Sequence, residues 1–134
     1  MKKYRKKWIF LLLAAMLLTA CRQDHEKNQE AIDMNITPEE AKSIMDSQEG
    51  YIILDVREQE EYDQGHIPGA ILIPYTQIEE AAADQLPEKD QLILVYCRSG
   101  RRSKIAADTL VQMGYTNIKE FGGIIDWPYE VEKP

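Results

Sequence analysis

Basic residues are scarce in this sequence outside its first seven positions. The 134 residues carry a net charge of −7 at neutral pH, and five of the sixteen Lys and Arg residues lie between Lys2 and Lys7. Without those five residues the net charge falls to −12. Because nucleic-acid phosphates are held mainly by basic surface, a domain this acidic is a poor nucleic-acid binder, and we expect no nucleic-acid partner.

No apolar run is long enough for an ordinary membrane-spanning helix. The longest, Trp8–Leu18, has about half of the ~20 residues that a span needs. It follows the cationic segment MKKYRKK and leads into Leu18-Thr19-Ala20-Cys21, which is the arrangement of an export signal. These last four residues resemble the bacterial lipobox, in which the cysteine is lipid-modified and becomes the first residue of the mature protein.

We therefore expect residues 1–20 to be a lipoprotein signal peptide, residues 21–35 a polar tether and residues 36–134 the folded domain. A lipidated Cys21 places the domain outside the cytoplasm, anchored to the cell membrane as a lipoprotein. The ~14 tether residues have a reach of roughly 20 Å if they are flexible. The alternative is an ordinary secretory signal that is cut nearby, with Cys21 incidental.

Cysteine is also scarce, since Cys21 and Cys97 are the only two. Extracytoplasmic proteins commonly pair their cysteines in disulfides, but a lipidated Cys21 has no thiol to share. Cys97 is then the sole free thiol, and a redox function lacks a second thiol to resolve a disulfide. A lone cysteine is most often a small buried hydrophobe, so its neighbours must decide its role.

Strand-like and helix-like segments alternate after residue 35. Apolar runs at 51–56 and 92–96 are typical of parallel strands that are covered on both faces. Shorter strands are expected at 70–73 and 117–121, with a weak first strand around Asn35 and Ile36. The alternation over about 100 residues predicts one α/β domain with a mainly parallel sheet.

Helices are expected between these strands, at 38–47, 58–64, 76–85 and 102–113. Thr37-Pro38-Glu39-Glu40 has the pattern of a capped helix start. The last helix carries apolar residues at a spacing that makes one face, with Gly114 after it as the cap: Ile105, Ala106, Thr109, Leu110 and Met113.

Cys97 lies where such a sheet binds its ligands, at the carboxyl end of a strand. Its loop, YCRSGRRS, contains three arginines and no histidine. Inward-turned loop amides, the following helix N-terminus and the guanidinium groups all favour a thiolate over a thiol. The loop therefore predicts a cysteine that ionises without a neighbouring base and holds an anion on its sulfur.

Several motifs in order resemble a single-domain rhodanese, a thiosulfate sulfurtransferase-like family. They extend from about residue 35 to residue 130 and comprise Leu54-Asp55-Val56-Arg57-Glu58, Glu61-Tyr62, GHIPGA at 65–70, YCRSGRRS at 96–103, Gly114-Tyr115, and Gly122-Gly123-Ile124 with Trp127. Each motif alone is weak, but their combination and order are specific.

The resemblance implies a five-stranded, mainly parallel sheet flanked by helices on both faces. It also implies that Cys97 carries sulfane sulfur as a persulfide, taken from a donor such as thiosulfate and passed to cyanide or a thiol. The substrate-binding cradle is implied to be the loop after Cys97, whose amides surround the sulfur and whose arginine side chains attract the donor: Arg98, Ser99, Gly100, Arg101, Arg102 and Ser103.

Other residues favour structural roles. We expect Asp55 and Arg57 to form an ion pair that fixes the loops, and His66 to be a hydrogen-bonded turn residue rather than a general base. Trp127 and Tyr129 are expected to pack the C-terminal segment. No cofactor or metal is expected, the partners are a small-molecule donor and acceptor and the membrane, and a monomer is the default expectation.

Three other functions compete with sulfur transfer. A cysteine-dependent phosphatase or arsenate reductase also uses a loop that ends a strand and cradles an oxyanion. A phosphatase needs an arginine six places after its cysteine, whereas Ser103 is at that place here and Arg102 comes one place early. The remaining alternatives are a non-enzymatic rhodanese-like binding module, against which Cys97 and its arginines count, and a structural or redox lipoprotein.

Overall fold

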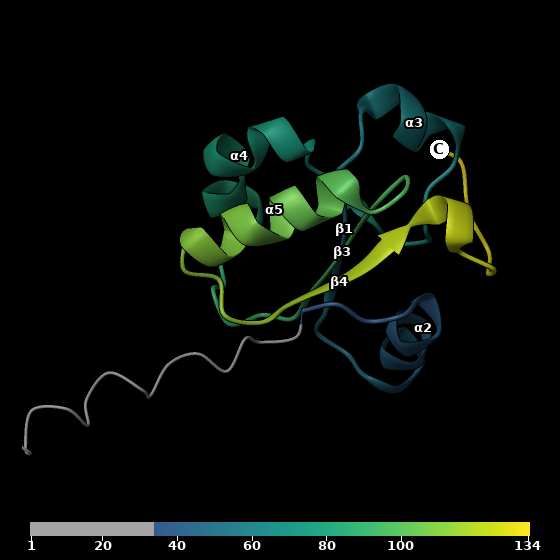
Figure 1. Ribbon diagram of the computed structural model, residues 1–134, viewed down its shortest axis with the longest axis horizontal. Coiled ribbons are helices and arrows are strands. Elements are labelled where there is room, and N and C mark those ends of the chain that lie inside the picture. The colour runs from purple at the N-terminus through teal and green to yellow at the C-terminus, as the bar shows by residue number, and fades with distance from the viewer. Residues whose placement is uncertain (1–33) are drawn as a thin grey trace, which may run out of the picture. The chain divides into compact units, whose positions relative to one another are not determined.

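Four parallel strands form the sheet in residues 34–134, the part of the chain that this computed structural model describes. They are β1 (Ile52–Asp55), β2 (Ile71–Leu72), β3 (Ile93–Cys97) and β4 (Ile118–Gly123), in the order β2-β1-β3-β4 (Figure 1). All three pairings are parallel, which confirms the predicted α/β class. The expected signal peptide, Cys21 and most of the tether fall in residues 1–33, outside the described residues.

Helices cover both faces of the sheet. In Figure 1, α4 (Ile78–Gln85) and α5 (Arg101–Gln112) lie on one face and α2 (Pro38–Ser47) on the other. The helix α3 (Gln59–Gln64) follows β1, and two short 3-10 helices, η1 (Tyr75–Gln77) and η2 (Ile124–Asp126), precede α4 and follow β4. Each face of the sheet buries its own hydrophobic cluster, so the domain has two helical layers around one sheet.

Alternation along β3 decides which layer receives the cysteine. Leu94 and Tyr96 belong to the cluster that includes Ala41 of α2, whereas Val95 and Cys97 belong to the cluster that includes Leu110 of α5. Successive side chains of a strand point to opposite faces. The Cys97 side chain therefore points toward the face that α4 and α5 cover.

The start of α2 forms as the sequence predicts. The Thr37 hydroxyl accepts a hydrogen bond from the Glu40 amide at 3.1 Å, and the Glu40 carboxylate accepts one from the Thr37 amide at 2.8 Å. Pro38 occupies the first turn, where its missing N–H has no partner to lose. This reciprocal capping box needs only residues within one turn, so it could be predicted locally.

The sheet has one strand fewer than the five expected. The expected first strand is reduced to a single parallel bridge between Asn35 and Glu120. The Ile36 amide donates to the Glu120 carbonyl at 2.9 Å, and the Glu120 amide donates to the Met34 carbonyl at 2.7 Å. Because the cap of α2 begins at Thr37, the pairing cannot continue beyond this point.

The buried face of α5 agrees with the predicted one only in part. Ala106 and Leu110 are buried and Met113 packs against the core, as predicted, but Ile105 is 41% exposed. The buried residues of the helix are Ser103, Ala106, Ala107 and Leu110. These four positions follow the i, i+3, i+4, i+7 spacing of a helix face. The first of these positions is Ser103, which belongs to the site described next. Because this residue is polar, the hydrophobic pattern of the sequence did not indicate that it lies on the buried face.

Candidate active site

Cys97 is the last residue of β3, which lies between β1 and β4 in the sheet. The chain then turns through Arg98, Ser99 and Gly100, and α5 begins at Arg101. Gly100 is the N-cap of α5 and has a φ of 105°, a left-handed conformation that glycine adopts without strain. This turn brings the helix N-terminus back over the end of β3, as the sequence predicts.

Two groups of the turn contact the Cys97 sulfur directly. The Gly100 amide donates to Sγ at 3.0 Å, and the Ser103 hydroxyl oxygen lies 3.4 Å from Sγ. The sulfur is nearly enclosed, because Cys97 is only 1% exposed. Cys97 is also the only cysteine among residues 34–134, and its thiol is free.

The same contacts set the charge of the sulfur. Burial, the largest single effect, raises the pKa of the Cys97 thiol. Hydrogen bonds from the Ser103 hydroxyl and from the amides of Ser103, Gly100 and Ser99 together outweigh burial, so the net pKa is lowered. The loop thus favours a thiolate through hydrogen bonds and does not need a histidine.

The three arginines of the loop have different surroundings. The Arg102 guanidinium donates to both carboxylate oxygens of Glu61 on α3, at 2.7 and 2.8 Å. This ion pair lowers the pKa of the Glu61 carboxyl to about 2. The Arg101 guanidinium lies 5.9 Å from the centre of the Tyr75 ring. Among the described residues neither Arg98 nor Arg101 forms an ion pair, so both remain available to an anionic substrate.

A cleft of about 510 Å³ adjoins the loop at Arg98. It is lined by the exposed hydrophobic residues Ile125, Tyr129 and Val131 and by Gln64, the last residue of α3. The Ile125 amide donates to the Arg98 carbonyl at 3.2 Å, which ties this wall to the cysteine loop. A small organic molecule can therefore approach the loop along a partly apolar surface.

Gly123 permits the close approach of β4 to the loop, and sequence reasoning had assigned it no such role. It pairs with Cys97 in the sheet, and a Cβ atom at this position would lie 1.9 Å from the Arg98 carbonyl oxygen. Real Cβ atoms do not approach backbone that closely, so only glycine fits. The glycine pair of the Gly122-Gly123 motif was the available signal.

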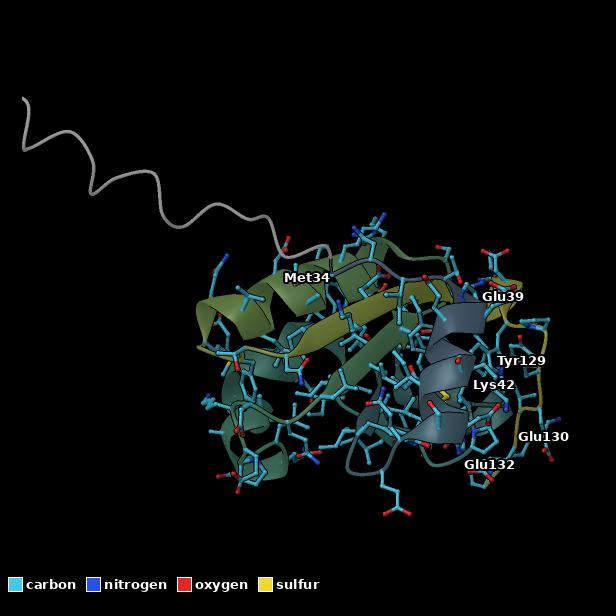
Figure 2. All side chains as sticks on the ribbon, turned by 90° about the horizontal axis from the view of Figure 1, so that it is seen from below. Met34, Glu39, Lys42, Tyr129, Glu130 and Glu132 are labelled. Carbon is cyan, nitrogen blue, oxygen red and sulfur yellow. The ribbon has the colours of Figure 1, made fainter. Side chains whose placement is uncertain are left out.

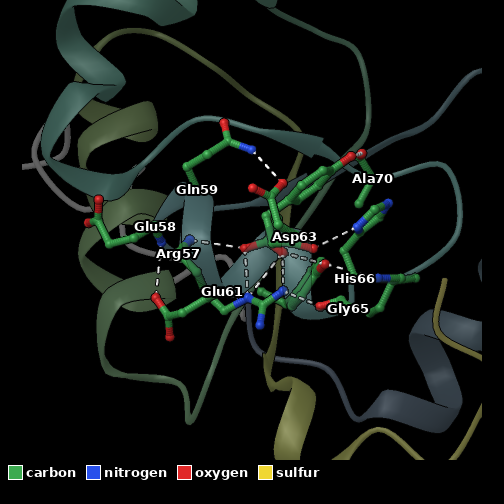
Figure 3. Close-up of polar contacts among 12 residues, drawn as sticks. Arg57, Glu58, Gln59, Glu61, Asp63, Gly65, His66 and Ala70 are labelled. Atoms are coloured by element: carbon green, nitrogen blue, oxygen red, sulfur yellow. Dashed lines mark hydrogen bonds and ion pairs between the residues drawn. The ribbon is translucent and has the colours of Figure 1, made fainter. Parts of the chain in front are cut away.

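An ion pair fixes the neighbouring loop after β1 (Figure 3). Arg57 donates to both oxygens of Asp55 at 2.7–3.0 Å and to the Gly65 carbonyl at 2.8 Å. The Tyr96 hydroxyl donates to Asp55 at 2.6 Å and accepts from the Ile67 amide at 3.1 Å. The expected Asp55–Arg57 pair is thus present, and it joins the loop to β3 beside Cys97.

His66 and the aromatic residues near the C-terminus lie in packing positions. The His66 ring stacks on Tyr62 at 3.7 Å, and its Nδ1 is 2.9 Å from the Tyr62 carbonyl (Figure 3). Trp127 belongs to the α2-side cluster. Tyr129 lies near α2 at the edge of the domain (Figure 2), with Lys42 Nζ 5.5 Å from its ring centre.

Glu120 is a second residue of the site that sequence reasoning missed. It lies on β4, is 3% exposed, and its carboxylate accepts a hydrogen bond from Ser103 at 2.5 Å. Ser103 in turn contacts the Cys97 sulfur. Residues 117–121 predicted only a short strand, and nothing in their local pattern indicated a carboxylate next to the cysteine loop.

Within residues 34–134, no helix combines the length and the apolar character that crossing a bilayer requires. The same residues contain no group of three or more His, Cys, Asp or Glu side chains arranged to hold a metal ion.

The fold and the cysteine loop agree with the relatives of this chain. A family model for the rhodanese-like domain matches residues 37–128, and the chain belongs to this family. It is 42% identical over 73 residues to the thiosulfate sulfurtransferase PspE of Escherichia coli (strain K12), covering 54% of this chain and 70% of PspE. A solved structure described as rhodanese with anions from E. coli matches with a TM-score of 0.59 and 38% identity, over 63% of this chain and 99% of that one.

A longer relative shows similar identity. The chain is 38% identical over 110 residues to YrkF of Bacillus subtilis (strain 168), which is named as a candidate sulfur carrier protein. The match covers 81% of this chain but only 58% of YrkF, so the chain spans little more than half of that relative. The family is therefore that of rhodanese-like sulfurtransferases and sulfur carriers.

The lowered pKa of Cys97 predicts its reactivity. In the Cys21→Ser chain, where Cys97 is the sole thiol, alkylation by iodoacetamide is expected to show a midpoint well below the ~8.5 of a free cysteine. The measurement is the alkylation rate constant as a function of pH, because the midpoint is independent of how far burial slows the reaction. A midpoint at or above ~8.5 contradicts the hydrogen-bond account.

Proposed function

We propose that this protein is a sulfurtransferase that moves sulfane sulfur from a donor such as thiosulfate to a thiol or cyanide through a Cys97 persulfide. The observation that carries this proposal is the enclosed Cys97 sulfur, which accepts a hydrogen bond from the Gly100 amide at 3.0 Å and contacts the Ser103 hydroxyl. Such a site supports a negative charge on sulfur both before and after a second sulfur atom is added.

The reaction proceeds in two half-reactions. The Cys97 thiolate attacks the outer sulfur of thiosulfate, the sulfur–sulfur bond of the donor breaks, and sulfite leaves with the electron pair. The acceptor then attacks the outer sulfur of the persulfide, and Cys97 leaves as a thiolate. The amides of Ser99, Gly100 and Ser103 stabilise the anionic sulfur, and no metal or cofactor enters either step.

The charged side chains of the loop support selection of an anionic donor. Arg98 and Arg101 are exposed and form no ion pair among the described residues, so they attract thiosulfate toward the sulfur. The cleft beside Arg98 suits the organic part of a thiol acceptor. We propose a monomer whose partners are these small molecules.

Arg102, unlike Arg98 and Arg101, is held in an ion pair, and this pairing favours sulfur transfer over phosphoryl transfer. Its guanidinium already forks onto the Glu61 carboxylate, whereas a phosphatase needs its loop arginine free to fork onto phosphate. We expect the protein to release sulfite from thiosulfate in the presence of a thiol and to leave aryl phosphates intact. Both assays are run on one preparation with Cys97→Ser as the blank.

The outcomes of these two assays are distinct. Cys97-dependent release of sulfite without release of phosphate supports the sulfurtransferase. Cys97-dependent release of phosphate without sulfur transfer overturns it in favour of a phosphatase. Absence of both reactions, in a preparation that is folded by circular dichroism, favours a rhodanese-like binding module instead.

We also propose that Cys21 is lipid-modified and anchors the domain outside the cytoplasm, with residues 22–35 as its tether. In a bacterial host grown with a labelled fatty acid, the wild-type chain is expected to become labelled and to sediment with membranes. Cys21→Ser is expected to lose the label while its domain keeps the same sulfur transfer. A wild-type protein found in the cytosol with its N-terminal segment uncleaved rules this proposal out.

A further inference from the structure

A buried carboxylate lies next to the cysteine loop, and the chemistry proposed above does not use it. Glu120 is 3% exposed, and none of the ion pairs formed within residues 34–134 includes it. Burying a carboxylate without a cation is costly unless hydrogen bonds compensate. The groups that donate hydrogen bonds to Glu120 are therefore needed to stabilise its buried carboxylate.

Glu120 and Cys97 meet at the same hydroxyl group. The Ser103 Oγ atom lies 2.5 Å from Glu120 Oε1 and 3.4 Å from Cys97 Sγ, and Ser103 is fully buried. The Gly122 amide also donates to Glu120 Oε1, at 2.9 Å. The Gly100 carbonyl lies 3.0 Å from the same Oγ atom. A hydroxyl has one proton, so Ser103 cannot donate to the carboxylate and to the sulfur at the same time.

Two arrangements of protons follow. When Ser103 donates to the Glu120 carboxylate, its oxygen is left to accept the proton of a neutral Cys97 thiol across the 3.4 Å contact. When the sulfur is an anion, it requires the Ser103 proton for itself. Two anions close together in a buried site also repel one another, so the Glu120 carboxylate opposes ionisation of the thiol in both ways.

We propose that Ser103 is a shared hydroxyl for which the Glu120 carboxylate and the Cys97 sulfur compete, so that Glu120 opposes ionisation of the Cys97 thiol. Glu120 is then a positioning residue that acts on the sulfur through Ser103. The proposal rests on the proposed function only in its consequence for sulfur transfer, because ionisation of the thiol can be measured without any sulfur donor.

Few other charges face Glu120. A hollow of about 270 Å³ reaches it and is lined by Met34, Asn35, Lys104 and Asp108. Lys104 and Asp108 of α5 are exposed, the segment 34–36 contributes no titratable group, and β3 contributes only Cys97. On β4 itself the preceding residue is Lys119.

The test compares two variants that are expected to move one quantity in opposite directions. In the Cys21→Ser chain, Glu120→Gln removes the negative charge and leaves Ser103 free to donate to sulfur, so the alkylation midpoint of Cys97 is expected to fall by roughly one pH unit. Ser103→Ala removes the donor and is expected to raise the midpoint by a similar amount.

A matched control is available in the same hollow. Asp108→Asn removes a carboxylate that lines the hollow, is exposed, and makes no contact with Ser103, so the midpoint is expected to stay unchanged. In a Ser103→Ala background, Glu120→Gln is expected to have a smaller effect than it has alone. Shifts of both single variants in one direction, or an unchanged midpoint in Glu120→Gln, contradict the proposal.

A second measurement separates this proposal from the proposed function. Formation of the Cys97 persulfide from thiosulfate is followed by intact mass in the same variants. If no persulfide forms, the sulfurtransferase proposal fails, and the alkylation midpoints still decide the role of Glu120.

Discussion

Cys97→Ser is expected to lower sulfur transfer by on the order of 10³-fold or more, to the uncatalysed background. A serine oxygen cannot hold sulfane sulfur as a persulfide does, and no other thiol lies among residues 34–134 to replace Cys97. The rate is measured as sulfite released from thiosulfate in the presence of cyanide and, separately, of a small thiol.

The fold is expected to survive this exchange. Serine has nearly the shape of cysteine, and Gly100 and Ser103 can hydrogen-bond its oxygen as they do the sulfur. Circular dichroism and the midpoint of thermal unfolding serve as the control. Transfer that persists in a folded Cys97→Ser protein removes the basis for any mechanism through this residue.

Gly123→Ala is expected to cause the second-largest loss, on the order of 10²-fold in sulfur transfer. The added methyl group would lie 1.9 Å from the Arg98 carbonyl oxygen, 2.3 Å from its carbon and 2.5 Å from Ser99 Cα. The cysteine loop must therefore move, and displacement by about 1 Å is enough for a loss of this size. The alkylation midpoint of Cys97 is expected to rise at the same time, because the Gly100 amide no longer reaches the sulfur.

Gly50→Ala provides a control for the general effect of losing a glycine. Gly50 has a φ of 74°, and an added Cβ meets no atom within 4 Å, so the change introduces backbone strain far from the cysteine loop. We expect lower thermal stability with unchanged transfer by the folded protein. Equal activities of Gly123→Ala and the wild type would show that the tight contact with Arg98 does not position the loop.

Features that depend on neighbouring residues could be predicted from the sequence. The capping box of Thr37 and Glu40 closes within one turn, and β3, its terminal cysteine and the turn into α5 form one continuous segment. The Asp55–Arg57 ion pair spans only two residues. The weak first strand expected around Asn35 is a single bridge, because the helix cap at Thr37 ends the pairing. The count of five strands came from the family resemblance.

Features that depend on contacts between distant segments could not be predicted. The fork of Arg102 onto Glu61 joins residues 41 positions apart, and without it the three arginines of the loop look equivalent. The contact of Ser103 with Glu120 spans 17 positions and places a carboxylate beside the cysteine loop. The need for glycine at 123 appears only when β4 lies against the Arg98 carbonyl.

The most direct test of the central claim is the intact mass of the reduced Cys21→Ser chain before and after treatment with thiosulfate. We expect the mass to increase by one sulfur atom, fragmentation to place that atom on Cys97, and addition of cyanide or a thiol to restore the original mass. A mass that does not change under conditions in which the protein releases sulfite, or an added sulfur that is absent from Cys97, would contradict the persulfide mechanism.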